Sequence, residues 1–150
     1  MKLELCTDVC APVDRCFDLS RDLDLHRRSM AHTSEEAIAG RTTGLIELGE
    51  EVTWRGRHFG LMLEHTARIT RFERPLQFRD EMVKGHFKLF VHDHIFEATQ
   101  VGTRMRDVLE FRSPLGPIGA LVDLLVLKRY LNRLLANRND VIRREAEQLS

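Results

Sequence analysis

The stretch from residue 88 to residue 111, KLFVHDHIFEATQVGTRMRDVLEF, decides the fold of this chain. Two segments in it, Lys88–Ala98 and Thr103–Phe111, alternate in side-chain character, and Val101-Gly102 lies in the link between them. Alternation with a period of two is typical of β-strands, and a short link with glycine joins neighbouring strands of a hairpin. The stretch therefore predicts two antiparallel strands.

The same pattern continues on the N-terminal side of this hairpin. Residues 2–9 form a first alternating segment, and further short segments follow after residue 35, with glycine or proline at most of the breaks between them. The expected strands of this second group are Glu36–Ala39, Ile46–Leu48, Glu51–Arg57, Leu61–Phe72 and Leu76–Lys84. Consecutive short strands with tight links predict an antiparallel meander.

Helices are expected at two places. Pro12 begins a short helix, since proline is tolerated in a first turn, and a second short helix lies around Leu25 to Met30. After Pro117 the apolar spacing changes to three, four and seven, which predicts a helix from Ile118 to Gln148. Its apolar stripe is Leu121, Leu124, Leu125, Leu131, Leu134, Leu135 and Ile142.

This order predicts an α+β helix-grip fold as a single domain over residues 1–150. About seven strands form a curved antiparallel sheet, in the order one strand, two helices, about six strands between Leu45 and Arg112, and one long helix. The short segment near Glu36 to Ala39 precedes these six. A sheet with one apolar face needs a cover, and the C-terminal helix is the only element large enough to provide it. A bent sheet that grips one helix leaves a gap, and small-molecule sites form in such gaps.

Composition narrows the function classes. Lys+Arg and Asp+Glu number 23 each, so the formal net charge is +0, which argues against a nucleic-acid binder. The longest apolar run of the last helix, Leu124 to Leu127, is far too short to span a membrane, and residues 1–30 are too charged for a signal peptide. We therefore expect a cytoplasmic protein. An edge strand of its sheet could pair with another chain or stay capped, so a monomer and a homodimer both remain open.

Cysteine usage agrees with that location. The three cysteines are an odd number gathered near the N-terminus, which is not a disulfide framework. Reduced thiols are the rule in the cytoplasm. Cys6, Cys10 and Cys16 are each expected to be small buried hydrophobic residues.

Several short segments carry a resemblance to a known superfamily. They are Trp54, His58-Phe59-Gly60, Ile69, Phe72, Pro75, Phe78-Arg79-Asp80-Glu81-Met82-Val83-Lys84-Gly85, Phe87, His92, His94, Phe96, Gly102-Thr103-Arg104-Met105, Asp107 and Pro114-Leu115-Gly116. In these the chain resembles the SRPBCC superfamily, which includes START lipid-transfer domains, polyketide cyclases and the birch-pollen allergen family. One departure is His86, where such sequences commonly have proline. The resemblance implies the helix-grip fold, whereas the superfamily's functions range from carriers and sensors to cyclases.

Alternation also sorts the candidate site residues by face. Three strands each place polar side chains among apolar ones on the face that should be concave. These sets are Phe78, Asp80 and Met82; Phe90, His92, His94 and Phe96; and Met105, Asp107, Leu109 and Phe111. A buried carboxylate is costly unless paired, so His94 and Asp107 are expected to meet across the last hairpin.

Three interpretations of the His94–Asp107 pair remain open. The pair is a structural contact, it orients the polar end of a mostly apolar ligand, or it is the acid–base pair of a cyclase-like or dehydratase-like enzyme. His92 and His94 together could also hold zinc, with His65 or Asp107 as a third ligand. Two histidines are weak evidence, so we expect no metal. Because nucleotide, dinucleotide and nucleophile motifs are absent from the sequence, we also expect no cofactor.

The predicted function is the binding or carrying of a small hydrophobic or amphipathic molecule, such as a lipid, a polyketide-like compound or an aromatic compound. Trp54 and the strand residues above would form one wall of the cavity. Leu121, Leu124 and Leu125 of the helix would form the opposite wall. The alternatives are the enzyme just described and an interaction module whose cavity is filled by its own side chains.

Overall fold

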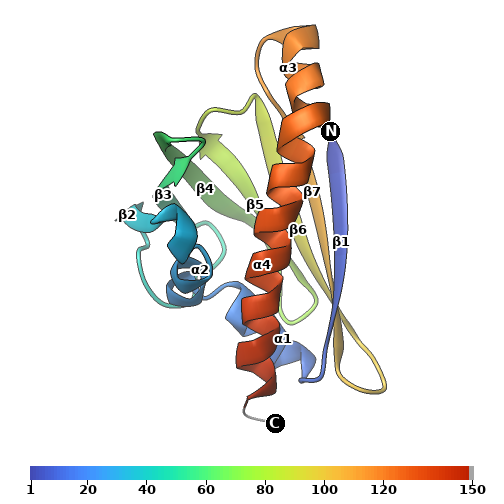
Figure 1. The fold of residues 1–150 in the computed structure, drawn as a ribbon. Helices are drawn as coiled ribbons and strands as arrows, with labels where there is room; N and C mark the ends of the chain where they lie inside the picture. Colours follow the sequence, from blue (N-terminus) through green and yellow to red (C-terminus); the bar gives the residue numbers. More distant parts are fainter. Residues whose placement is uncertain (149–150) are drawn as a thin grey trace.

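The computed structural model describes residues 1–148 and contains a seven-stranded antiparallel sheet in the order β1-β7-β6-β5-β4-β3-β2 (Figure 1). Consecutive strands from β2 through β7 pair as a meander. β1 pairs with β7, with Leu3 opposite Leu109 and Leu5 opposite Asp107. The α+β helix-grip prediction is confirmed. The strands are β1 Lys2–Val9, β2 Glu36–Gly40, β3 Glu51–His58, β4 Leu61–Glu73, β5 Gln77–Lys84, β6 Leu89–Ala98 and β7 Thr103–Arg112.

Two short helices and a 3₁₀ turn connect β1 to β2. They are α1 Val13–Ser20, α2 Leu23–Ser29 and η1 Ala31–Thr33. Asp22 caps α2, since its carboxylate accepts hydrogen bonds from the backbone N–H groups of Asp24 and Leu25 at 2.9 and 3.2 Å. The two predicted helices are thus present, with proline immediately before the first.

The predicted strand Ile46–Leu48 is wrong. This segment is a loop, and the one bridge beside it joins Asp22 to Leu45. Ile46 is buried, and its backbone N–H donates to the carbonyl oxygen of Arg21 at 3.2 Å. Its apolar character reflects packing of a loop into the core rather than strand pairing.

The C-terminal helix is one continuous rod with a π turn inside it. Its parts are α3 Gly116–Val122, the π turn η2 Asp123–Leu127 and α4 Lys128–Glu147. In Figure 1, α4 crosses the concave face of the sheet, whereas α3 projects past the start of β1. Within residues 1–148, no helix combines the length and the apolar character that crossing a membrane requires.

The predicted apolar stripe of this helix is correct only for α4. Leu131, Leu134, Leu135 and Ile142 are buried. Leu121, Leu124 and Leu125 are exposed, at 56%, 56% and 65%. A π turn holds more residues per turn than an α-helix, so the positions before it are rotated away from the stripe that follows, and α3 has left the sheet by then.

A cluster of aromatic side chains fills the core at the α1 end of the sheet. Phe17 of α1 is fully buried, and its ring meets those of Phe72, Phe78 and Phe96 edge-to-face at 5.3 Å each. The space between α1 and the sheet is filled here by aromatic side chains. The open space therefore lies further along the sheet, toward the end where α3 projects.

The cysteine prediction is only partly correct. Cys16 is on the buried side of α1, whereas Cys6 and Cys10 are exposed. Cys6 alternates with the inward-facing Leu5 on β1, so it points to the convex face, and Cys10 lies in the turn before α1.

A candidate ligand cavity with two polar clusters

A cavity of about 410 Å³ lies between the sheet and α4. This volume is within the range of small-molecule pockets. Most of its wall is apolar, with strand residues on one side and α4 residues on the other. The main apolar lining residues are Trp54, Ala67, Ile69, Phe78, Phe90 and Leu109 from the sheet and Leu127, Leu131, Leu134 and Leu135 from the C-terminal helix.

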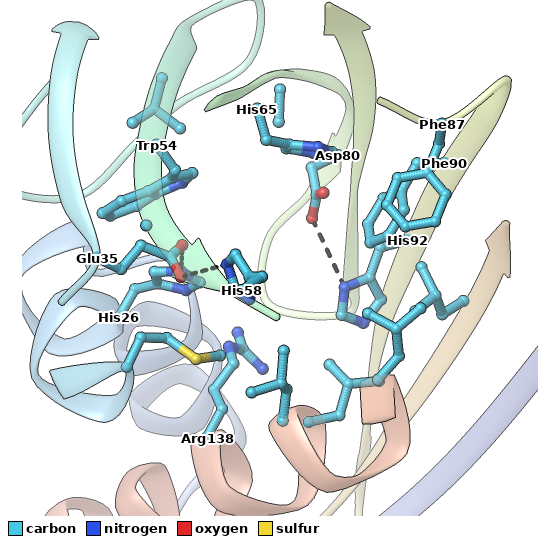
Figure 2. A pocket seen from close by; sticks show the side chains of 18 of the residues that line it. His26, Glu35, Trp54, His58, His65, Asp80, Phe87, Phe90, His92 and Arg138 are labelled. Carbon is cyan, nitrogen blue, oxygen red and sulfur yellow. Dashed lines mark hydrogen bonds and ion pairs between the residues drawn. The ribbon is translucent and has the colours of Figure 1, made fainter. Parts of the chain in front are cut away.

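Histidines interrupt this apolar wall. The sequence has seven, all within the described residues, and six of them line the cavity. They are His26, His58, His65, His86, His92 and His94, whereas His32 is exposed on η1. Apart from His65 and the exposed His86, they belong to two clusters, each built around a carboxylate, and Figure 2 shows members of both facing the cavity.

The first cluster, here called the Asp107 cluster, consists of Asp80, His92, His94, Asp107, Arg138 and Asn139. His94 lies between two carboxylates, with Nε2 at 2.7 Å from Asp80 Oδ2 and Nδ1 at 3.3 Å from Asp107 Oδ1. His92 Nε2 lies 2.8 Å from the same Asp107 oxygen. His94 and Asp107 are direct register partners on β6 and β7, so the predicted pair is brought together.

The helix completes this cluster from the other side. Asn139 Nδ2 donates to Asp107 Oδ2 at 2.6 Å, and Arg138 Nη1 lies 3.9 Å from Asp107 Oδ1. Arg138 also donates to the carbonyl oxygen of Ser20 at 2.8 Å. Asp107 is only 3% exposed and lies beneath the histidines, outside the cavity lining.

The pKa shifts follow from this burial and pairing. Burial alone would lower the pKa of His94, but its bonds to Asp107 and Asp80 raise it. Burial and the charge of His94 lower the pKa of His92. Burial would raise the pKa of Asp80, but the hydrogen bond and charge of His94 bring it to about 2. These shifts favour the charged form of His94, between the two carboxylates, and the neutral form of His92 beside it.

The second cluster, here called the Glu35 cluster, consists of His26, Glu35, His58 and Tyr130. His26 Nε2 lies 3.1 Å from Glu35 Oε1, and His58 Nε2 lies 3.9 Å from Glu35 Oε2. The other ring nitrogen of His58 is 2.6 Å from the Tyr130 hydroxyl of α4. Burial would raise the pKa of Glu35, but the hydrogen bond with His26 and the charges of the nearby histidines lower it.

Sequence reasoning missed the Glu35 cluster. Glu35 precedes the short strand β2, in a segment without clear periodicity. One available signal was β3, where Trp54, Gly56 and His58 share a face. A Cβ at Gly56 would lie 3.3 Å from both Glu35 Cγ and His58 Nε2, so the glycine makes room for this cluster.

The structure divides the predicted site residues into two groups. Those that line the cavity are Trp54, Phe78, Asp80, Phe90, His92, His94 and Leu109. Those outside the lining are Met82, Phe96, Met105, Asp107, Leu121, Leu124 and Leu125.

The second group lies outside the lining for separate reasons. Phe96 and Met105 belong to the core around α1, and the sulfur of Met82 lies against Gly85. Asp107 lies under the histidines. The expectation that Leu121, Leu124 and Leu125 form the opposite wall is wrong, because α3 has left the sheet and Leu127 to Leu135 take that place.

The β3–β4 turn and the first part of the C-terminal helix carry exposed apolar side chains. Phe59 in this turn lines the cavity, is 58% exposed and packs on Tyr130 with ring centroids 4.5 Å apart. The exposed residues of the turn and the C-terminal helix are Phe59, Leu61, Met62, Leu115, Ile118, Leu121, Val122, Leu124, Leu125 and Val126.

Comparisons with known proteins agree with this architecture. A family model described as polyketide cyclase / dehydrase and lipid transport matches residues 9–137. A comparison with curated protein sequences finds no significant match.

Solved structures share the fold at low sequence identity. A protein from Thermus thermophilus is 18% identical with a TM-score of 0.73, covering 95% of this chain and 97% of that one. A START superfamily protein from Mycobacterium smegmatis is 13% identical with a TM-score of 0.74, covering 99% of both chains. Ginseng major latex-like protein 151 from Panax ginseng is 13% identical with a TM-score of 0.68, covering 98% of this chain and 97% of that one.

Proposed function

Because the chain belongs to the polyketide cyclase / dehydrase and lipid transport family, we propose that it binds and carries one small amphipathic molecule in the cavity between the sheet and α4. The observation that carries the proposal is the cavity itself, about 410 Å³ with apolar walls and a polar cluster on either side. An open volume of this size favours ligand binding over an interaction module with a filled interior.

The lining defines the class of ligand. Trp54, Phe78 and Phe90 offer aromatic surface for an apolar body, and burial contributes about 25 cal/mol per Å² before the costs of binding. Asp80 and His58 offer hydrogen-bonding partners at separate places on the wall. A molecule with an apolar body and hydroxyl or carbonyl groups, such as a lipid, a polyketide-like compound or an aromatic compound, fits this pattern better than a bare hydrocarbon.

The exposed apolar residues around Phe59 support the same class of ligand. Phe59 itself lines the cavity and is 58% exposed, so an apolar molecule could reach the interior past an apolar side chain. A second candidate function is acid–base catalysis by His94 and Asp107. It is less favoured, because Asp107 lies outside the lining and would act only through His94.

Trp54 provides the readout for a test, since it is the single tryptophan and lines the cavity. We expect native mass spectrometry of the purified protein to detect one bound molecule per chain. After its removal, oleic acid or 1-anilinonaphthalene-8-sulfonate should change Trp54 emission with one-to-one stoichiometry and raise the melting temperature.

A matched pair of variants locates the binding. Ala67→Phe fills the cavity from β4, so it should weaken probe binding at least about 10-fold. Ala98→Phe adds the same side chain at an exposed position of β6 and should leave binding unchanged. If the purified protein carries nothing and no probe alters Trp54 emission, the proposal is wrong.

A further inference from the structure

Three potential metal ligands meet in the wall of the cavity. One ligand atom each from Asp80, His92 and His94 lies within 4.8 Å of the other two. Asp80 Oδ2 is 2.7 Å from His94 Nε2 and 4.0 Å from His92 Nδ1. All three residues line the cavity, so an ion can reach this point from the open space, and the rest of its coordination sphere would face that space.

The far sides of both imidazoles are already occupied by one carboxylate. His92 Nε2 and His94 Nδ1 lie 2.8 and 3.3 Å from Asp107 Oδ1. A metal-bound histidine almost always donates its second ring N–H to a carboxylate, a carbonyl or water, and this bond fixes the tautomer and the ring orientation. Here a single oxygen of Asp107 can serve both rings.

Residues of other elements hold Asp107 and the two histidines in place. Asn139 of α4 donates to Asp107 at 2.6 Å, and the ring of Phe78 stacks on His94 at 4.2 Å with an interplanar angle of 14°. The rings of His92 and His94 lie 3.8 Å apart. The two imidazoles are therefore fixed side by side with their remaining nitrogens toward Asp80, which is the arrangement a metal site requires.

We propose that Asp80, His92 and His94 bind one divalent transition metal ion, with Asp107 as the outer partner of both histidines. Two imidazoles and one carboxylate suit Zn²⁺, Co²⁺ or Fe²⁺ rather than Mg²⁺ or Ca²⁺. Three protein ligands leave at least one coordination position for water or for a polar group of a bound molecule. From the sequence alone we expect no metal, and the third ligand of any zinc site would be His65 or Asp107. The geometry assigns the position of third ligand to Asp80 instead.

The test uses the full chain stripped of metal and titrated with Co²⁺ and Zn²⁺. We expect one equivalent of Co²⁺ to give visible d–d absorption bands, and Zn²⁺ to displace it. Asp80→Asn and His94→Gln should each weaken Zn²⁺ binding by at least about 100-fold, and Asp107→Asn by about 10- to 100-fold. His32→Gln removes an exposed histidine and should change nothing.

Circular dichroism establishes that each variant is folded. If a variant is not folded, X-ray absorption of the zinc-loaded wild type decides instead, with two imidazoles expected in the first coordination shell. The proposal is overturned if Co²⁺ gives no d–d bands, if the shell lacks two imidazoles, or if folded Asp80→Asn binds Zn²⁺ as tightly as wild type. The Trp54 probe assay measures ligand binding separately. A failure of metal binding would therefore overturn the metal site without contradicting the proposed ligand binding.

Discussion

Asn139 and Asp107 are 32 residues apart in the chain, yet Asn139 Nδ2 lies 2.6 Å from Asp107 Oδ2. The middle of α4 is therefore hydrogen-bonded to the middle of β7 through side chains buried to 1% and 3% exposure. Apolar packing alone would allow a helix to slide along a sheet. A buried polar contact at one point fixes its position, because the unpaired groups of a shifted helix would be costly.

Asp107→Asn tests this contact. The amide cannot accept the same set of hydrogen bonds from Asn139 and both histidines. It also removes one of the two carboxylates beside His94 and the buried negative charge that lies 3.9 Å from Arg138. We expect a loss of about 3 kcal/mol in the free energy of unfolding, measured by urea denaturation. Asp8→Asn is the control on the neighbouring strand β1, since Asp8 pairs with Arg104 at an exposed position. Equal stability of the two variants would contradict the role of Asp107.

Leu121 on α3 and Leu134 on α4 test whether the two parts of the C-terminal helix differ in how they pack. Leu121→Ala should change the free energy of unfolding by less than about 0.5 kcal/mol, because Leu121 is exposed on α3. Leu134→Ala should cost about 2–4 kcal/mol, because Leu134 is buried on α4 against the sheet. Urea denaturation of both variants measures this difference. A similar cost at the two positions would mean that α3 packs on the sheet.

These two leucines show which features of the fold the sequence could predict and which it could not. Strand period and glycine breaks predicted the meander, and the alternation around His94 and Asp107 predicted that their faces meet. The apolar stripe of a predicted helix, in contrast, does not indicate where the sheet beneath the helix ends. It also does not indicate where a π turn rotates one part of the helix relative to the other. Glu35 was missed because it lies in an aperiodic segment, where no pattern predicts which way a side chain points.

The thiols offer a chemical check of the fold. Burial raises the pKa of the Cys16 thiol despite its contact with Thr103, and Cys16 is fully buried, whereas Cys6 and Cys10 are exposed. Ellman's reagent should therefore react rapidly with two thiols of the native protein and with Cys16 only after unfolding. A Cys16→Ala variant should keep the rapid phase at full amplitude. Rapid reaction of all three thiols in native protein would mean that α1 does not pack its Cys16 side chain into the core.

The Glu35 cluster predicts a specific dependence of stability on pH. The pKa of Glu35 is lowered in the folded protein from its ordinary value of 4.5, since the hydrogen bond with His26 and the neighbouring histidine charges outweigh burial. The unfolded chain therefore takes up the proton first as pH falls. The stabilisation from ionised Glu35 is complete above the ordinary pKa and is lost as pH falls through the folded pKa.

Glu35→Gln should accordingly lower the free energy of unfolding by about 1–2 kcal/mol near neutral pH, and the difference from wild type should shrink below about pH 4.5. Urea denaturation at a series of pH values measures both quantities. Glu97→Gln, at an exposed position of β6, should show no such change with pH. A difference that stays constant down to low pH would contradict the ionised Glu35, because a neutral Glu35 bonded to His26 would lose nothing on acidification.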